Sequence, residues 1–165
     1  WPWEWYESPV NMALIKAERV LGTDLTRQQQ MAAYMDESID HPSEAYKNFM
    51  LDILFESHCG KLPKSELGNM LRVQIARDRQ MGRTLKENST NKVDIYIAGN
   101  MHVRKDAGVP FHNDLDSLSI MMLSVGDSRD PFNIVPDSYQ DNPITDYVIF
   151  TPEVEQKDHC SRFEG

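Results

Sequence analysis

The sequence is short of cysteine, of basic residues and of long apolar runs. Two cysteines in 165 residues cannot supply the paired Cys-x-x-Cys spacing of a structural zinc site. Lysine and arginine number 17 against 26 acidic residues, a net charge of −9, whereas nucleic acid requires a basic surface. No apolar run approaches the roughly 20 residues that a membrane-spanning helix needs. These shortages argue against a structural zinc, a nucleic-acid partner and a membrane-spanning helix within this sequence.

Short catalytic motifs are missing too. The sequence has no H-E-x-x-H motif, no G-x-S-x-G elbow and no Cys-His pair in a recognisable local signature. It also has no internal repeat and no low-complexity tract. A length of 165 residues with 40 % hydrophobic content suffices for one domain with a sizeable core. We therefore expect a single domain over residues 1–165.

Before residue 90, apolar residues recur at helical spacing between recognisable caps. The predicted helices run from the Ser8 cap and Pro9 to Gly22, from the Thr26 cap to about Glu37, from the H-P-S-E segment at His41 to about Ser57, and from Ser65 to about Leu85. In the last helix, Gln74 and Asp78 share a face at i, i+4 spacing. That face either reaches a site or carries a buried polar anchor of a solvated helix.

After residue 90 the apolar segments are of strand type. Residues 93–98 alternate between β-branched apolar and other side chains, which predicts a strand that stops at Gly99. Residues 118–125 and 147–150 are continuous apolar segments, and we expect two buried strands there. The stretch 126–143 is rich in Asp, Ser, Asn and Pro and predicts a loop. Among α/β and α+β arrangements we expect α/β, with helices packed on a mixed sheet.

The turn after residues 93–98 carries a histidine and two cations, His102, Arg104 and Lys105. In open α/β sheets, the loops beyond the carboxyl ends of strands line the ligand crevice. This position favours a functional site. The alternative is a partly exposed histidine in an ordinary turn, and a lone G-x-x-H does not distinguish the two.

Further motifs extend this pattern over nearly the whole chain. The segment A-G-N-M-H-V-R-K-D-A-G-V-P is preceded by W-P-W-E-W-Y-E-S-P-V at the start, by H-C-G-K-L-P at residues 58–63 and by V-Q-I-A-R-D-R-Q-M at residues 73–81, and it is followed by D-Y-V-I-F-T-P. In this order the motifs resemble the ChaN-like family of haem-binding lipoproteins, which belongs to a wider superfamily with G-x-x-H motifs.

The chain departs from this family in one respect. Family members usually open with a further strand and a G-E-x-H type motif, and neither precedes Trp1. We interpret residues 1–165 as a single ChaN-like domain that lacks this strand and motif, so its sheet is expected to be incomplete at the N-terminus. The three tryptophans in the first five residues fit this interpretation, because such aromatics need something to pack against.

The resemblance implies haem as the ligand. Haem requires an apolar slot, axial ligands such as His or Tyr, and cations near its propionates. The expected iron ligands are Tyr6 and His102, and a tyrosine with an ordinary pKa of about 10 must be activated by the iron or by a cation. The other expected haem-binding residues are His58, Lys61, Arg104 and Lys105, whose cations would form charge-assisted hydrogen bonds with the propionates.

Three of these residues have alternative roles. Tyr6 also fits a plain core tyrosine. A lysine such as Lys61 at a helix C-terminus is favoured by the helix dipole without any ligand. His58 equally suits a hydrogen bond to a carbonyl oxygen at the helix end.

The resemblance also implies haem or iron handling at the bacterial cell envelope, in the periplasm or as a lipoprotein attached to the outer membrane. Cys59 and Cys160 lie in or near family-like motifs, and we expect a disulfide between them in such an oxidising compartment. On the chain-entropy model this bond would stabilise the fold by about 4 to 5 kcal/mol. The alternative is two free buried thiols in a reducing cytosol.

Two functions other than haem binding remain open. The wider superfamily includes proteins proposed to be peptidases or esterases, so His102 would instead be a metal ligand or general base of a metal-dependent hydrolase. A partner-binding domain would use the aromatics at residues 1–6 as its interface. We expect a binding module rather than an enzyme, with a homodimer and a haem-transport partner as further expectations.

Overall fold

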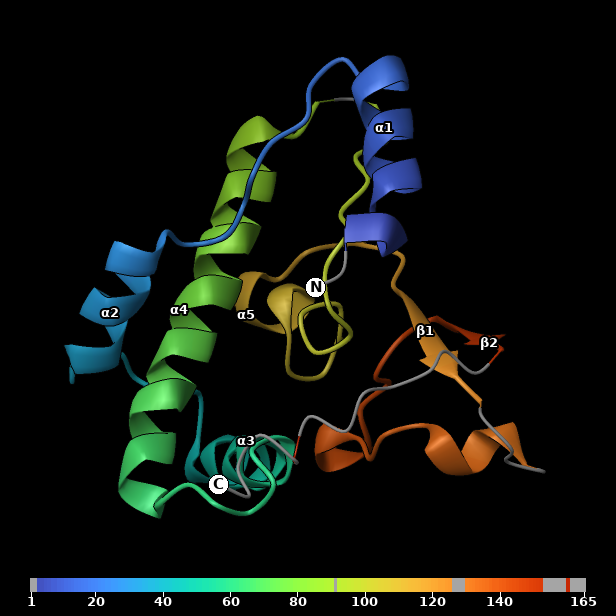
Figure 1. The fold of residues 1–165 in the computed structure, drawn as a ribbon. Helices are drawn as coiled ribbons and strands as arrows, with labels where there is room; N and C mark the ends of the chain where they lie inside the picture. The colour runs from blue at the N-terminus through green and yellow to red at the C-terminus, as the bar shows by residue number, and fades with distance from the viewer. Residues whose placement is uncertain (1–2, 91, 126–129, 153–159, 161–165) are drawn as a thin grey trace.

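The computed structural model describes residues 3–90, 92–125, 130–152 and 160 (Figure 1). In chain order its elements are η1 (Trp3–Trp5), α1 (Glu7–Lys16), α2 (Arg27–Met35), α3 (Glu44–Ser57), α4 (Lys64–Asn88), α5 (Val109–Asn113), β1 (Ile120–Ser124), η2 (Pro131–Ile134), η3 (Tyr139–Asp141) and β2 (Tyr147–Thr151), where η denotes a 3-10 helix. Helices combined with a small sheet confirm the predicted α/β class.

Helices α2 and α3 start at the caps expected from the sequence. The Thr26 hydroxyl accepts a hydrogen bond from the backbone N–H of Gln29, and the Gln29 side chain accepts one from the backbone N–H of Thr26. The Ser43 side chain accepts a hydrogen bond from the backbone N–H of Tyr46 and caps α3 in the same way. Local sequence therefore determines where these two helices begin.

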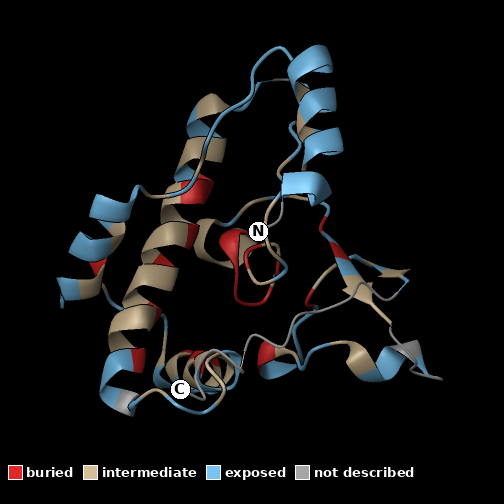
Figure 2. Ribbon diagram, in the orientation of Figure 1, coloured by how far each residue is buried: buried red, intermediate tan, exposed pale blue. Residues whose placement is uncertain are grey.

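The hydrophobic core lies between α3 and α4 and is closed by segments that follow α4. Its buried residues are Tyr46 and Met50 of α3, Leu71 and Ile75 of α4, Ala107 and Tyr139. The α4 members are four residues apart and therefore share one face of the helix. Figure 2 shows the buried residues concentrated along α4, in α3 and in the loop that precedes α5.

Helix α5 packs closely on α4 at a glycine. A Cβ added at Gly82 would lie 2.0 Å from the Cγ of Asn113. The side-chain amide of Asn113 donates to the carbonyl oxygens of Asp78 and Val109 at 2.8 and 2.9 Å. Gly82 is therefore required for the contact that holds the segment after the G-x-x-H loop against α4.

Helix α1 differs from its prediction at both ends. It starts at Glu7, before the expected Ser8 cap, and stops at Lys16, well before Gly22. None of its residues is buried, so its apolar side chains have no core to face. Beyond it the chain runs along α4, where Arg19 Nη2 donates to the Asn88 carbonyl oxygen at 2.6 Å.

Strands β1 and β2 pair in parallel, with Ile120 opposite Tyr147. The described part of the sheet is this parallel pair, so it is not mixed as predicted. The two strands are also not uniformly buried, because Met121 is 1 % exposed and its neighbour Met122 is 58 % exposed. A sheet covered on one face buries only alternate residues of each strand.

Residues 93–98 do not form the predicted strand. No backbone hydrogen bond joins them to any other described residue, and Val93, Ile95 and Ile97 are exposed. Tyr96 points inward, and its hydroxyl donates to the Met81 sulfur at 2.7 Å. The residue pattern is that of a strand, but a strand also needs a partner along its edge.

The predicted loop at residues 126–143 contains the short helices η2 and η3, and its residues 126–129 lie outside the described part of the chain. The side chain of Asp130 accepts a hydrogen bond from the Phe132 backbone and caps η2. Helix η3 inserts Tyr139 into the core. Within the described residues, no helix is both long and apolar enough to cross a bilayer.

Candidate functional site

The G-x-x-H loop is a compact turn that returns on itself. The backbone N–H of His102 donates to the Gly99 carbonyl oxygen, and the backbone N–H of Val109 donates to the His102 carbonyl oxygen, each at 2.9 Å. A Cβ added at Gly108 would lie 2.5 Å from the Met101 carbonyl oxygen. Only glycine therefore lets the chain close over the histidine.

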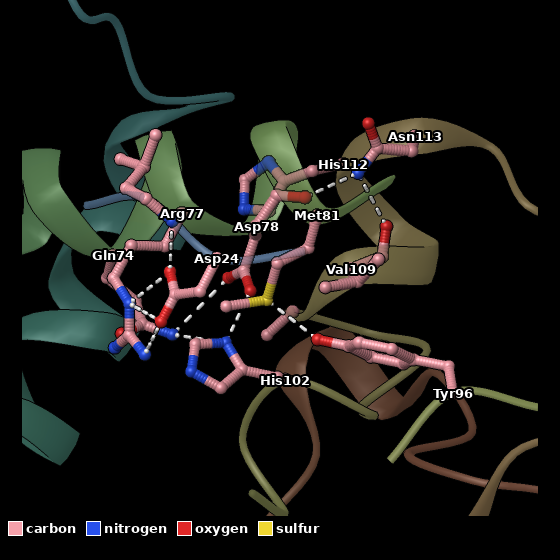
Figure 3. Close-up of polar contacts among 12 residues, drawn as sticks. Asp24, Gln74, Arg77, Asp78, Met81, Tyr96, His102, Val109, His112 and Asn113 are labelled. Carbon is pink, nitrogen blue, oxygen red and sulfur yellow. Dashed lines mark hydrogen bonds and ion pairs between the residues drawn. The ribbon is translucent and has the colours of Figure 1, made fainter. Parts of the chain in front are cut away.

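His102 packs against α4 and forms a buried pair with Asp78 (Figure 3). The distance between His102 Nδ1 and Asp78 Oδ1 is 2.6 Å, and the Asp78 side chain is fully buried. Gln74, one turn earlier on α4, places its amide nitrogen 3.4 Å from Asp78 Oδ2 and 3.1 Å from His102 Nδ1. The i, i+4 face noted in the sequence thus contacts the predicted site histidine.

One arrangement of protons satisfies the strongest contacts of this trio. His102 Nδ1–H donates to Asp78 Oδ1 and the Gln74 amide donates to Asp78 Oδ2, which leaves the Gln74 to His102 approach as a contact between two donors. Burial raises the pKa of Asp78, and the hydrogen bond from His102 opposes that rise. In this tautomer His102 Nε2 carries a lone pair, and it makes no hydrogen bond with any described residue.

Arg104 lies in the same loop but is committed to the interior. Its side chain is 1 % exposed and donates two hydrogen bonds to Asp106, at 2.9 and 2.6 Å. It also donates to the Asp137 carbonyl oxygen, and its guanidinium lies 5.3 Å from the centre of the Phe49 ring. The backbone N–H of Tyr139 donates to Asp106. Arg104 therefore holds the segment around η3 and does not face solvent or a cleft.

Lys105 pairs with Asp146 at 2.8 Å. The hydrogen bond from Lys105 lowers the pKa of Asp146. This pair is about one-third exposed and borders a shallow polar pocket. His102, Arg104 and Lys105 thus contact three different carboxylates, those of Asp78, Asp106 and Asp146.

An apolar cleft of about 320 Å³ lies between α2, α3 and α4. Its lining residues are Gln30, Met31, Tyr34, Leu54, His58, Met70, Val73 and Gln74. No charged side chain belongs to this lining. Gln74 joins the two parts of the site, because it lines the cleft and also contacts Asp78 and His102.

His58 enters the cleft from the C-terminal end of α3, where it is the C-cap residue. Its Nδ1 lies 2.8 Å from the Leu54 carbonyl oxygen, so Nδ1–H donates to that oxygen and Nε2 carries the lone pair. Nε2 makes no hydrogen bond with any described residue. His58 therefore makes the expected hydrogen bond to a carbonyl oxygen at the helix end, and it still has a nitrogen available for a ligand.

The turn after His58 contains the expected disulfide. Cys59 and Cys160 are joined across 101 residues of sequence, which confirms the predicted pairing. Cys59 and Gly60 both have a positive φ, 60° and 67°. Lys61 follows on the surface of this turn, and its backbone N–H donates to the His58 carbonyl oxygen at 3.2 Å.

Tyr6 lies on a different element from these residues. It is the N-cap residue of α1 and is half-buried. Figure 1 shows α1 at the top of the molecule and α3, which carries His58, at the bottom. The expected site residues thus divide into three groups: Tyr6 at α1, His58 and Lys61 at the cleft, and His102, Arg104 and Lys105 in the G-x-x-H loop.

Several cleft residues were not among the expected site residues. Met31, Tyr34, Met70 and Val73 lie within the helices predicted from Thr26 to about Glu37 and from Ser65 to about Leu85, and the sequence indicated no role for them in a site. The apolar face of α2 was a weak sequence signal. A short helix made mostly of polar residues does not indicate that two of its large side chains line a cleft. Asp78 was visible through its spacing from Gln74, but its contact with His102 was not.

A second histidine, the half-buried His112, contacts the core residue Tyr46. The Tyr46 hydroxyl lies 2.7 Å from His112 Nε2 and donates to the Ala107 carbonyl oxygen at 3.1 Å, so His112 Nε2–H donates to Tyr46. Burial lowers the pKa of His112 to about 4 and raises the pKa of Tyr46. Both effects keep this pair uncharged at neutral pH.

Comparison with known proteins yields one family and one solved structure. A family model described as haem-binding uptake, Tiki superfamily, ChaN matches residues 1–112. The structure titled "Cofacial heme binding to ChaN of Campylobacter jejuni" is similar, with a TM-score of 0.59 and 26 % sequence identity. The match covers 84 % of this chain and 56 % of that chain, so this chain spans little more than half of ChaN. No curated protein matches the sequence.

Proposed function

We propose that this chain, which belongs to the ChaN family of haem-binding uptake proteins in the Tiki superfamily, binds haem in the cleft between α2, α3 and α4. The observation that supports this proposal is a histidine with an available Nε2 in an uncharged and largely apolar cleft. The similar ChaN structure is described as binding haem cofacially, which supports the same class of ligand.

The cleft fits part of a haem. Its volume of about 320 Å³ is at the lower end of the range for ligand pockets, roughly 300 to 1,000 Å³, so it would cover one side of the macrocycle. Met31, Tyr34 and Met70 add thioether and phenol groups, which together with imidazole are the usual protein ligands of haem iron. When bound, haem would supply an iron centre that takes axial ligands of this kind.

His58 is the residue that we assign as iron ligand in the cleft. The Leu54 carbonyl oxygen accepts the Nδ1 proton and thereby fixes the ring orientation and the tautomer, as is usual for histidines that bind metals. Because no charged side chain lines the cleft, the haem propionates would point outward, and Lys61 on the surface beside His58 would attract them.

The other expected ligands remain proposals of lower rank. His102 has an available Nε2, but its ring lies beyond Gln74 and is not part of the cleft lining. Arg104 is buried against Asp106, and Lys105 is paired with Asp146, so a propionate would have to replace a carboxylate at either one. Tyr6 would reach iron only at a different place, because α1 is not one of the helices that form the cleft.

The role of the whole protein is a further proposal, since the chain spans only part of ChaN. We infer haem or iron handling at the bacterial cell envelope, in the periplasm or on an outer-membrane lipoprotein, with a haem-transport partner. The disulfide supports this inference because such bonds persist in oxidising compartments. A homodimer is supported by the exposed tryptophans and apolar side chains of η1 and α1.

A metal-dependent hydrolase has less support. Among the described residues, no group of three or more His, Cys, Asp or Glu side chains gathers as a metal site would require. The paired His102 and Asp78 supply a single available nitrogen. We therefore do not propose the hydrolase as a second function.

The test is an absorption titration of the oxidised chain with ferric haem. We expect a saturable Soret shift for the wild type, and a clearly weaker or shifted band for His58→Ala. A matched control is His41→Ala, which removes a half-buried histidine whose ring contacts Ser43 and Glu44 outside the cleft. Tyr6→Phe and His102→Ala test the two originally expected iron ligands.

The possible outcomes separate the parts of this proposal. A Soret band that is unchanged in His58→Ala but lost in Tyr6→Phe or His102→Ala would move the iron to that residue and reject the cleft. No shift in a folded wild type would reject haem binding by this chain. If His41→Ala and His58→Ala change the Soret band by the same amount, the effect of His58→Ala is not specific to the cleft.

A further inference from the structure

Gln74 belongs to both parts of the site. Its side chain lines the cleft between α2, α3 and α4. From the same position on α4, its amide reaches the buried pair of His102 and Asp78 (Figure 3). A ligand in the cleft therefore meets a side chain whose other contacts are with the histidine of the G-x-x-H loop.

The Gln74 amide is poorly satisfied by these contacts. Its nitrogen lies 3.4 Å from Asp78 Oδ2, which is a long hydrogen bond, and 3.1 Å from His102 Nδ1. Because His102 Nδ1–H donates to Asp78 Oδ1, two N–H donors face each other at this second contact. The amide oxygen of Gln74 makes no hydrogen bond with any described residue. One donor is thus opposed and one acceptor is unused.

The amide has a second orientation, reached by a half-turn about its terminal torsion, which exchanges the oxygen and the nitrogen. The oxygen then faces His102 Nδ1–H and accepts from it alongside Asp78 Oδ1. The cost is that the oxygen also faces Asp78 Oδ2, at the longer of the two distances. Each orientation satisfies one neighbour and opposes the other, so the two are close in free energy.

A ligand shifts such a balance only if it interacts differently with the two orientations. The face of an aromatic macrocycle carries negative charge density, so it attracts an N–H group and repels a carbonyl oxygen. A porphyrin therefore favours the orientation in which the amide nitrogen of Gln74 is turned away from His102 and toward the ring. In that orientation the amide oxygen is turned toward His102.

We propose that Gln74 couples the cleft to the pair of His102 and Asp78: a porphyrin in the cleft turns the Gln74 amide, and its oxygen then accepts the His102 Nδ1–H. The inference rests on the proposed haem binding in the cleft and does not depend on which residue binds the iron. Gln74 is a positioning residue in this role. The coupling is reciprocal, so a change at the pair that favours the turned amide also strengthens porphyrin binding.

The first experiment follows the Nδ1 proton of His102 by NMR. Its exchange with water is measured in the free chain and in the chain saturated with metal-free protoporphyrin IX, which is diamagnetic and needs no iron ligand. We expect exchange to become at least fivefold slower with porphyrin, because two acceptors then hold this proton. Unchanged exchange in a saturated chain would overturn the proposal.

Two glutamines of the same cleft provide a matched comparison. Gln74→Met keeps the length of the side chain and removes its amide. Gln30→Met does the same at the other glutamine of the lining, whose amide donates to the Leu25 carbonyl oxygen at 2.9 Å. We expect the slower exchange at His102 to be lost in Gln74→Met and kept in Gln30→Met. If it persists in both variants, the porphyrin protects His102 by excluding water, and the coupling is rejected.

The second experiment tests the reciprocal effect by raising affinity. In Asp78→Asn, the new amide oxygen accepts from His102 Nδ1–H at the Oδ1 position, so its nitrogen occupies the Oδ2 position that faces Gln74. This nitrogen donates to the Gln74 oxygen and populates the turned orientation before porphyrin binds. We expect the dissociation constant for protoporphyrin IX to fall about three- to tenfold, a gain that damage to the fold would not produce.

The same substitution in a second background shows whether Gln74 carries the effect. Asp78→Asn combined with Gln74→Met should bind protoporphyrin IX as Gln74→Met does, because the amide that the substitution turns is gone. Unchanged or weaker binding in Asp78→Asn alone would overturn the coupling. No porphyrin binding by the folded wild type would reject the proposed function and this inference with it, whereas binding without a change at His102 would reject the inference alone.

Discussion

Two regions of this molecule contain similar apolar patterns and bury them very differently. The helical body, which we define as α2 to α5 with the G-x-x-H loop, buries Ile75 to 1 % exposure. The apolar margin, which we define as residues 3–16, residues 93–97 and the open face of β1 and β2, leaves Ile95 82 % exposed. The periodicity of apolar residues predicts which face of an element can be buried. Burial occurs only where a second element covers that face.

The two regions also differ in their polar contacts. The helical body buries charged pairs such as Arg104 with Asp106 and His102 with Asp78, each satisfied by further hydrogen bonds. The linker between α1 and α2, which adjoins the margin, is connected to the body by half-exposed contacts, such as the ion pair of Asp24 with Arg77. Losing one partner should therefore destabilise the fold strongly where the pair is buried and weakly where the pair is half-exposed.

The largest effect should follow from breaking the buried pair of the body. Arg104→Met leaves the Asp106 carboxylate buried without its cation, and we expect a loss of about 3 to 5 kcal/mol in the free energy of unfolding. Urea denaturation measures it. The neighbouring Lys105→Met breaks a half-exposed pair and should lose at most about 1 kcal/mol. The double variant Arg104→Met/Asp106→Leu should recover much of the loss, and equal losses in Arg104→Met and Lys105→Met would contradict the comparison.

A pH dependence of stability should come from the half-buried His112. Burial lowers its pKa from 6.5 to about 4. Between pH 6.5 and pH 4 the histidine is therefore protonated in the unfolded chain and neutral in the folded chain. The stabilisation is fully present above pH 6.5 and is lost as the pH falls toward 4, by about 3 kcal/mol. Thermal unfolding of wild type and His112→Gln between pH 7 and 4 checks this. The difference between the two proteins should shrink on acidification, and parallel curves would refute the assignment.

A matched substitution compares the two regions directly. Ile75→Val removes one methylene from the core and should cost about 0.5 to 1.5 kcal/mol. Ile95→Val removes the same group from an exposed segment and should change stability by less than about 0.5 kcal/mol. Chemical denaturation of both variants provides the measurement. A cost for Ile95→Val as large as that for Ile75→Val would mean that residues 93–97 are covered in solution.

The smallest effect concerns the contact between the linker after α1 and α4. Arg77 holds Asp24 at 2.7 Å; burial raises the pKa of Asp24, but the hydrogen bond and charge of Arg77 outweigh it and lower the pKa overall. Asp24→Asn should reduce stability by about 0.2 to 1 kcal/mol, and the loss should shrink at high salt. Denaturation at low and high ionic strength measures it. A loss that does not depend on salt would indicate packing rather than charge.

The helices of the body were predictable because their information is local. Thr26 and Ser43 satisfy backbone N–H groups within three residues, and the stripe on α4 repeats at helical spacing. The strand expected at residues 93–98 was wrong for the converse reason, since hydrogen bonds to a neighbouring strand cannot be read from the segment itself. The predicted helix at residues 8–22 was too long. Its apolar residues have the spacing of a buried helix face, but no residue of α1 is buried.

The site residues expected from the sequence stay predictions, and of them the structure places His58 in the cleft lining. His58, Lys61 and His102 were singled out from their motifs, and the Cys59–Cys160 pairing expected from the family resemblance is present. The cleft was missed, because Tyr34, Leu54 and Met70 come from three helices and meet only in space. Arg104 was expected to bind a ligand, but it is buried and donates a hydrogen bond to Asp106, two residues further along the chain.

The sequence by itself determined the elements that depend on contacts within a few residues: the caps, the long α4, the tight G-x-x-H turn and the glycines it needs. Tertiary structure alone decided which apolar faces are covered, which carboxylate each cation of the loop meets, and that His58 and Gln74 line one cleft. The physical reason is range. A cap or a turn is satisfied by its neighbours in the chain, whereas burial and charge pairing depend on groups that only folding brings together.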